Sequence, residues 1–342
     1  MVSSALAGAP HETFFPPFFF VSLAPRGLGS SKWTWGARAF VASRGCAGCS
    51  AGAAGRATLR AAPRGVLRGA SEVRVFGRRS DAVQVRDLPP IRRFMPFVSP
   101  RRNDSLVYFE HELAVEAALA FAAERSRGRD PARPLTLFHL VLRAVALMLA
   151  ERPRLNRFTA GGRVWQRDGI WLSFSAKLRF DDDAPILTVK RRVEPEAGLD
   201  AMIDAIHAGL GEGRSGRRST ADREMGLLLR LPPPLVRTAL GVARGLDGLG
   251  LLPRGMVEAD PLFCSVFVAN LGSVGLDAGY HHLWEYGNCP IFCVLGRVRP
   301  GADGRRVATL KWTYDERVED GLYCARALEF LRDLVESPEK LG

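Results

Sequence analysis

The sequence has 342 residues, of which 47% are hydrophobic and 25% charged, proportions typical of an ordinary globular protein. The net charge of +12 suggests nucleic-acid binding, but residues 1–80 hold eleven basic and two acidic residues and so carry +9 of it. The remaining residues carry only +3, which argues against a nucleic-acid partner for the folded part. No run of 18 apolar residues occurs, so we expect no transmembrane helix and no membrane partner.

Residues 1–80 are rich in Ala, Gly, Ser and Arg and lack steady periodicity. They fit a disordered tail, an artefactual N-terminal extension or a transit peptide, and we favour one of the first two. The apolar stretch 14–24 contains two prolines and follows Glu12, where a signal peptide would carry Lys or Arg. We therefore predict a cytoplasmic protein with one domain over 85–342.

Six cysteines are present, and none of them predicts a metal site. Cys46 and Cys49 form C-x-x-C without a preceding strand or a second pair, the context that a zinc or redox centre needs. The four others lie in apolar surroundings, where buried free thiols in a reducing cytoplasm are expected. These are Cys264, Cys289, Cys293 and Cys324.

Order is expected to begin between Val83 and Arg93, with a helix over 113–125. Thr136 predicts the N-cap of a buried helix over 137–150, which Pro153 ends. His139 in this helix is interpreted as a core or helix-face histidine rather than a ligand.

Asp168-Gly169 lies between β-prone runs at 163–166 and 170–177, a pattern that predicts a hairpin. A strand at 186–193 and an amphipathic helix over 199–210 follow. Residues 211–222 are polar and predict a loop. The apolar stretch 225–256 predicts two helices broken by Pro232-Pro233-Pro234, packed on the domain or on a second subunit rather than on a membrane.

The C-terminal third predicts alternating strands and one final helix. Asp320 is placed to cap that helix. The predicted elements are strands at 263–269, 290–298 and 307–314, a turn at 301–305, and a helix over 322–335. Because the helices and strands do not alternate as strict βαβ units, we expect an α/β two-layer sandwich, with helices on a mixed sheet.

Three sequence motifs carry a resemblance to the catalytic domain of 2-oxoacid dehydrogenase acyltransferases. Residues 312–321 read W-T-Y-D-E-R-V-E-D-G, where that family has a strand and D-H-R-V-x-D-G. Residues 266–275 read V-F-V-A-N-L-G-S-V-G, similar to F-T-I-S-N-L-G-x-x-G. Residues 151–156 read E-R-P-R-L-N, similar to the E-x-P-x-L-N that ends a buried helix. The resemblance implies a chloramphenicol acetyltransferase-like fold.

The resemblance also implies a homotrimer with active sites between subunits, coenzyme A or acyl-CoA as substrate, and a small-molecule acyl acceptor. In the family a histidine is the general base, a serine donates to the tetrahedral oxyanion, and an aspartate forms a structural ion pair. Asp320 and Gly321 match the structural positions. Glu316 replaces the histidine and Ala269 replaces the serine, so both chemical groups differ.

These replacements impair the family's route. A thiol with a pKa of about 8.5 needs a strong base, and an ordinary carboxylate, with a pKa of about 4.3, is a poor one unless burial raises that value. Alanine has no oxyanion donor, and losing one such donor costs about 10²–10³ in rate. The replacement hypothesis places Glu316 as an orienter of His281 or His282, which would be the base. Asn270 or Ser273 would be the oxyanion donor.

Two adjacent histidines in a strand would point to opposite faces, so at most one would line a channel. They could instead cap a loop or pack at a trimer interface. Arg92 or Arg93 is the expected partner of Asp320. No lipoyl domain precedes residue 85, so the chain resembles stand-alone bacterial relatives, which also tend to carry D-E-R.

Three functional hypotheses follow. The first is an acyl-CoA-dependent acyltransferase with a non-standard site. The second is a catalytically inactive trimer that binds acyl-CoA or acts as a scaffold. The third, a nucleic-acid or membrane binder that acts through the basic tail, is the weakest because its charge is confined to residues 1–80.

Overall fold

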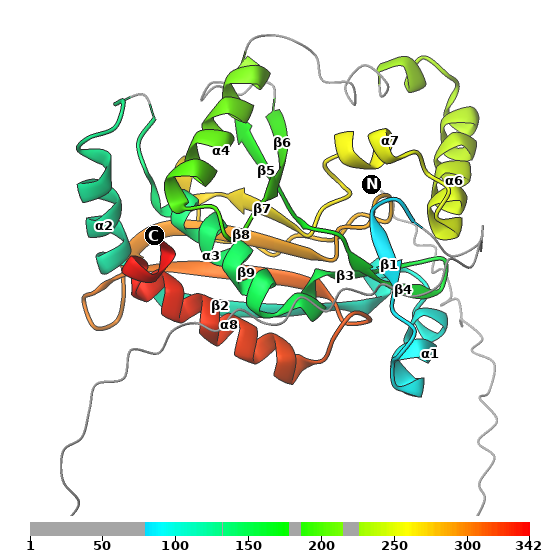
Figure 1. Ribbon diagram of the computed structural model, residues 1–342, viewed down its shortest axis with the longest axis horizontal. Helices are drawn as coiled ribbons and strands as arrows, with labels where there is room; N and C mark the ends of the chain where they lie inside the picture. The colour runs from blue at the N-terminus through cyan, green and yellow to red at the C-terminus, as the bar shows by residue number, and fades with distance from the viewer. Residues whose placement is uncertain (1–78, 132, 178–185, 215–225) are drawn as a thin grey trace, which may run out of the picture. The chain divides into compact units, whose positions relative to one another are not determined.

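The computed structural model describes residues 79–131, 133–177, 186–214 and 226–342, which belong to one compact unit (Figure 1). The predicted tail lies outside the described residues except for Arg79 and Ser80. Cys46, Cys49 and most of the predicted loop at 211–222 also lie outside them.

A six-stranded mixed sheet forms the centre of this unit, in the order β2-β9-β8-β7-β5-β6. β7 runs parallel to β5 and β8, whereas the other neighbouring strands are antiparallel. This arrangement confirms the predicted mixed sheet. The strands are β2 (Leu106–Ala114), β5 (Ile170–Lys177), β6 (Ile186–Val193), β7 (Val266–Asn270), β8 (Ile291–Pro300) and β9 (Arg306–Asp315).

Four helices cover one face of the sheet and enclose the main apolar core with it (Figure 1). They are α2 (Glu116–Ser126), α3 (Leu137–Glu151), α4 (Leu199–Arg214) and α8 (Gly321–Glu336). α3 is buried on most sides, as its nearly continuous apolar sequence predicts, and Arg152 and Pro153 follow its end. Residues 113–114, predicted as helix, belong to β2, because apolar residues at a strand end share the spacing of a short helix.

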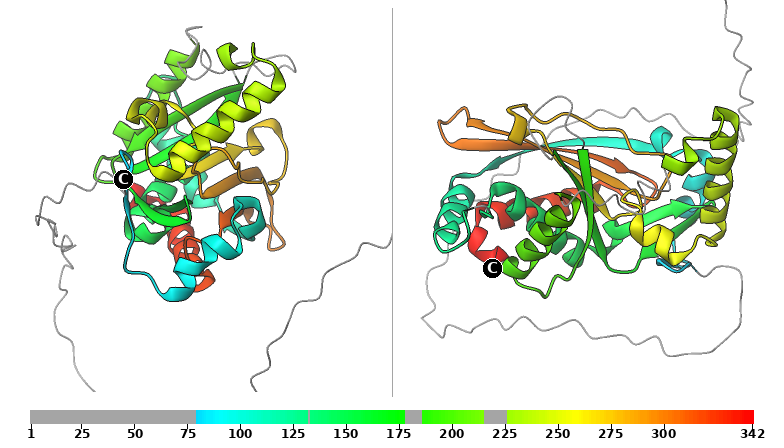
Figure 2. Two further views of the ribbon diagram at one scale, coloured as in Figure 1. Left: turned by 90° about the vertical axis from the view of Figure 1, so that its right-hand side faces the viewer. Right: turned by 90° about the horizontal axis from the view of Figure 1, so that it is seen from above.

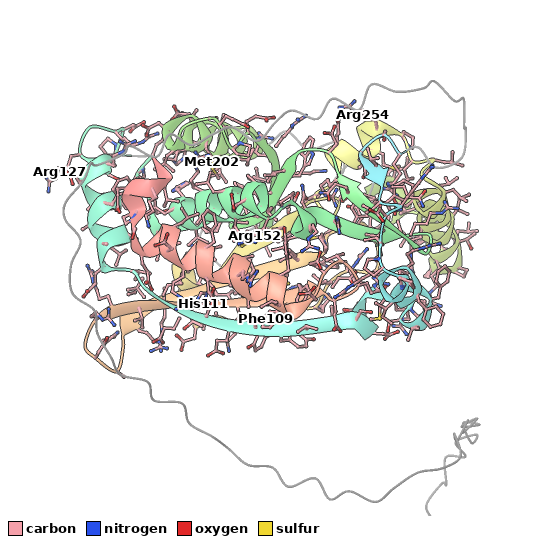
Figure 3. The ribbon with its side chains drawn as sticks, turned by 60° about the horizontal axis from the view of Figure 1, so that its bottom comes forward. Phe109, His111, Arg127, Arg152, Met202 and Arg254 are labelled. Atoms are coloured by element: carbon pink, nitrogen blue, oxygen red, sulfur yellow. The ribbon has the colours of Figure 1, made fainter. Side chains whose placement is uncertain are left out.

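The edge strand β2 packs against α8, as Figure 3 shows around Phe109 and His111. The Phe109 ring stacks on Tyr314 of β9 with centroids 5.5 Å apart. Arg332 of α8 donates from Nε to Nε2 of His111 at 2.7 Å. A second, smaller apolar cluster lies on the other face of the sheet, where Phe267 and Phe292 pack beneath the irregular segment 276–290.

The predicted hairpin around Asp168-Gly169 is wrong. β4 (Arg163–Arg167) pairs with β1 (Ala82–Gln84) and β3 (Arg157–Ala160) in a separate three-stranded sheet, whereas β5 belongs to the six-stranded one. Gly169, with φ of +72°, redirects the chain from one sheet to the other. The hairpin turn lies instead at Gly161-Gly162, where both residues also have positive φ.

The prolines at 232–234 begin a helix rather than separate two. Pro233 and Pro234 occupy the first turn of α6 (Pro233–Leu249), where a missing N–H breaks no hydrogen bond. α7 (Arg254–Ala259) follows it, and α1 (Pro90–Val98) lies at the same end of the fold (Figure 2). The 3₁₀ turns are η1 (Arg102–Ser105), η2 (Pro153–Asn156), η3 (Gly272–Val274) and η4 (Pro338–Leu341).

The described helices include none that is long and apolar enough to cross a membrane. The four cysteines in the described residues are buried and free, as predicted: Cys264, Cys289, Cys293 and Cys324.

His139 is a buried helix-capping residue, which confirms that it belongs to the core. Its Nδ1 accepts the backbone N–H of Thr136 at 3.2 Å and lies 2.8 Å from the Thr136 hydroxyl, completing a capping box. Burial, reinforced by the nearby charges of His207 and Arg129, lowers the pKa of His139 from 6.5 to about 4.

Replacing His139 by glutamine is expected to remove part of the acid sensitivity of folding. Between pH 6.5 and about pH 4 the unfolded chain binds a proton that the folded chain excludes. Stability contributed by the neutral His139 is therefore lost as pH falls through this window, by about 3 kcal/mol in total. Glutamine can keep the capping hydrogen bond without titrating. Urea unfolding at neutral and acid pH tests this, and an equally steep loss in the variant would contradict it.

Candidate functional site

Glu316 follows β9 and is the exposed residue in an otherwise buried run. Residues 312–315 and 317–319 are all buried. The N–H of Glu316 donates to the carbonyl of Ser105 at 2.9 Å, and its carbonyl accepts from Nη1 of Arg92 at 2.7 Å. The backbone at Glu316 is thus held on both sides. Its carboxylate makes no hydrogen bond or ion pair with the described residues.

A buried ion cluster anchors the backbone around Glu316. Asp315 is fully buried and accepts from Nε and Nη2 of Arg317 at 2.8 and 2.7 Å. Nε of Arg102 lies 3.8 Å from the same carboxylate. Arg317 also donates to the carbonyls of Ser99 and Pro100, at 2.9 and 3.0 Å, and so ties the end of α1 to β9.

Burial lowers the pKa of Arg102, and the charge of Asp315 opposes this effect. The two guanidinium groups therefore depend on one carboxylate. Sequence reasoning missed this cluster, although two of its members flank Glu316 in D-E-R and the third lies in the segment before β2. Three charges next to apolar strand residues were the available signal.

Asp320 caps α8, as predicted, by accepting the N–H of Tyr323 at 2.9 Å, and Gly321 is the first residue of that helix. This hydrogen bond lowers the pKa of Asp320. The predicted ion pair between Asp320 and Arg92 or Arg93 is absent from the described residues. Arg92 is engaged by the Glu316 carbonyl, and Arg93 lines a different cavity.

His281 and His282 do not point to opposite faces, which corrects the prediction. They lie in an irregular segment, where the alternation of a strand does not apply, and their rings stack with centroids 4.5 Å apart. The His281 ring also stacks on Phe292 at 4.0 Å, and its Nδ1 lies 2.7 Å from the His282 carbonyl. Burial lowers the pKa of His281.

The histidine pair and Glu316 are not brought together within one chain. Phe292, beneath His281, belongs to the small apolar cluster, whereas Tyr314, two residues before Glu316, belongs to the main core on the other sheet face. No hydrogen bond or ion pair links Glu316 to either histidine in the described part of the chain.

Ala269, Asn270 and Ser273 lie at the carboxyl end of β7. Oδ1 of Asn270 accepts the N–H of Ser273 at 3.1 Å, and the Ser273 hydroxyl donates to the Asn270 carbonyl at 2.8 Å. These bonds close the turn at η3 and occupy the Ser273 hydroxyl proton. The Asn270 amide nitrogen makes no hydrogen bond with the described residues, so it is the remaining side-chain donor at this position.

A polar cavity of about 130 Å³ lies beside the ion cluster, lined in part by Arg102, Arg317, Arg244 and Glu285. Glu285 is engaged by Asn103, whose backbone N–H and side-chain amide donate to it at 2.9 and 3.0 Å. Glu316 and both histidines lie outside this cavity. Among the described residues, no three His, Cys, Asp or Glu side chains form a group that could hold a metal ion.

Solved structures with the same architecture exist at low sequence identity. The cubic core of the pyruvate dehydrogenase multienzyme complex matches 76% of this chain and 94% of its own, with 17% identity and a TM-score of 0.50. This chain has the fold of a 2-oxoacid dehydrogenase acyltransferase catalytic domain.

Two further similarities agree with this acyltransferase fold. The catalytic core of the Thermoplasma acidophilum 2-oxoacid dehydrogenase complex matches 75% of this chain and 99% of its own, at 14% identity and a TM-score of 0.49. For a chloramphenicol acetyltransferase the values are 75%, 98%, 15% and 0.46. No protein-family model and no curated protein matches the sequence.

The acyltransferase fold is thus retained with altered chemical groups. The single chain presents one exposed carboxylate, Glu316, on a backbone held by buried charges. It offers one uncommitted amide donor, Asn270, at the end of β7. Ala269 supplies no donor. The burial that would make Glu316 a stronger base is absent in the single chain.

Proposed function

We propose that this protein is a stand-alone acyl-CoA-dependent acyltransferase in which Glu316 contacts the acyl acceptor. The observation that carries the proposal is the exposure of Glu316 within a buried and hydrogen-bonded run of residues. A backbone held on both sides orients its side chain at little entropic cost, which is how catalytic groups are positioned. The acceptor is a small molecule, and neither a nucleic acid nor a membrane is part of the proposal.

The proposal includes a homotrimer, because Glu316, His281 and Asn270 are separate in one chain and need a second subunit to meet. In the trimer, Glu316 would orient or replace the base, and the Asn270 amide would stabilise the oxyanion. We place the protein in the cytoplasm, where its buried thiols would stay reduced. No lipoyl attachment or metal ion takes part.

Replacing Glu316 by glutamine is expected to lower the rate of acyl transfer by at least about 100-fold and to leave the affinity for acyl-CoA unchanged. Glutamine keeps the shape of the side chain but cannot accept a proton. Release of free coenzyme A from a panel of acyl-CoAs, with amine, alcohol and thiol acceptors, measures the rate. Calorimetry measures the affinity.

Glu151→Gln is the matched control, because Glu151 is an exposed glutamate at the end of α3. It is expected to keep the wild-type rate. Undiminished acyl transfer by Glu316→Gln would exclude Glu316 as base or orienter. Loss of acyl transfer in a His281 or His282 variant alone would assign the base to that histidine.

A second function, a non-catalytic acyl-CoA-binding or scaffold trimer, is favoured by Ala269 and by the internal hydrogen bonds of Ser273. These remove two donors that an oxyanion site could use. Tight acyl-CoA binding by the wild-type chain with no transfer to any acceptor would support this function over the enzymatic one.

A further inference from the structure

A second cavity, of about 410 Å³, lies between α1 and the small sheet. Its charged lining consists of Arg86, Arg93 and Arg163, and no acidic side chain lines it. The three arginines are exposed, and none makes an ion pair or a side-chain hydrogen bond with the described residues. Three unpaired guanidinium groups around one concave surface attract a multiply charged anion.

The rest of the cavity wall is largely apolar. Phe97 is 67% exposed, and Val85, Leu88 and Val164 add aliphatic surface. Gly162, with φ of +70°, lets the Phe97 ring lie against the hairpin turn, because a Cβ there would come within 3.0 Å of the ring. The ring is therefore held at the cavity edge, where a planar group could stack on it.

This cavity is separate from the proposed acyltransferase site. Arg92 of α1 contacts the Glu316 carbonyl, whereas the adjacent Arg93 lines the cavity. Glu316, His281 and Asn270 do not line it. The cavity lies within the size range of small-molecule sites, about 300–1,000 Å³.

We propose that this cavity binds a phosphorylated small molecule of nucleotide size. The phosphate groups contact Arg86, Arg93 and Arg163, and a planar base stacks on Phe97. Guanidinium groups suit this role because their fork of N–H donors matches phosphate oxygens. The site does not depend on acyl transfer, so binding can be measured without turnover.

The test uses ADP as the probe for the full chain, with adenosine and inorganic phosphate as its two separated parts. Calorimetry is expected to show ADP binding at least about tenfold more tightly than either part. Arg93→Gln and Arg163→Gln are each expected to weaken ADP binding about tenfold. Phe97→Ala is expected to weaken binding of ADP and leave that of phosphate unchanged.

The matched control is Arg326→Gln, because Arg326 is an exposed arginine on α8, away from the cavity. It is expected to keep wild-type ADP affinity. No ADP binding, equal affinity for adenosine, or an equal loss in Arg326→Gln would overturn the proposal. The melting temperature of each variant shows whether it remains folded. Failure of acyl transfer with ADP binding intact would count against the acyltransferase proposal alone.

Discussion

Replacing Asp315 by asparagine is expected to lower the free energy of unfolding by about 3–5 kcal/mol, because two buried guanidinium groups then lose their shared carboxylate. Arg317 is bound to Asp315 through two hydrogen bonds, and Nε of Arg102 lies 3.8 Å from it. All three side chains are at least 94% buried. Asparagine has nearly the same shape, so the loss reports the charge rather than a cavity.

Urea unfolding followed by circular dichroism measures this loss. Asp303→Asn is the matched control, because Asp303 pairs with Arg305 in the exposed β8–β9 turn and should leave the midpoint unchanged. If Asp315→Asn unfolded at the wild-type urea concentration, the cluster would not anchor β9. In that case the held backbone at Glu316, on which the proposed function depends, would also be in doubt.

Replacing Arg79 by methionine is expected to cost about 3–5 kcal/mol of folding free energy. Arg79 donates to the carbonyl and the carboxylate of Asp247 at 2.6 and 2.5 Å, and to Asp81 at 2.8 Å. It also lies over the rings of Phe158 and Trp165, at 4.9 and 5.5 Å. Methionine keeps the apolar stem but leaves the buried Asp247 carboxylate without its partner.

The physical basis of this loss is visible in the acidic partners. Burial disfavours ionisation of Asp81, but the hydrogen bond and charge of Arg79 outweigh it and lower the pKa of Asp81. Asp247 is the one buried residue of α6, so Arg79 also fixes the end of that helix. Hydrogen exchange of α6 is expected to increase in Arg79→Met.

Arg299→Met serves as the control, since Arg299 forms an exposed pair with Glu112 and should change stability by no more than about 1 kcal/mol. The double variant Arg79→Met with Asp247→Leu is expected to recover part of the loss, because no unpaired carboxylate then remains at α6. A double variant less stable than Arg79→Met would contradict this explanation.

Local patterns predicted the elements whose periodicity and caps agree. α3 has an almost continuous apolar sequence with Thr136 before it and Pro153 after it, and the structure places it there. The cap of α8 at Asp320 was equally readable, because Asp is a preferred N-cap residue. The Asp168-Gly169 hairpin failed because a turn signal does not specify which strands pair.

The candidate site was predictable as a set of positions and not as an assembly. Glu316, Ala269, Asp320 and Gly321 were found by their places in family motifs. The stacking of His281 on His282 depends on an irregular segment whose path is set by packing on Phe292. The three arginines at the second cavity come from β4, α1 and the segment between β1 and α1, so no sequence window contains them.

Glu316 illustrates the division between the two levels. The sequence by itself determined that a carboxylate replaces the family's histidine and that alanine replaces its serine, because residue identity needs no geometry. Only the tertiary structure decided that Glu316 is exposed, that Arg102, Asp315 and Arg317 hold its backbone, and that both histidines lie elsewhere. These facts depend on contacts between residues more than 30 positions apart, which local propensity and spacing do not encode.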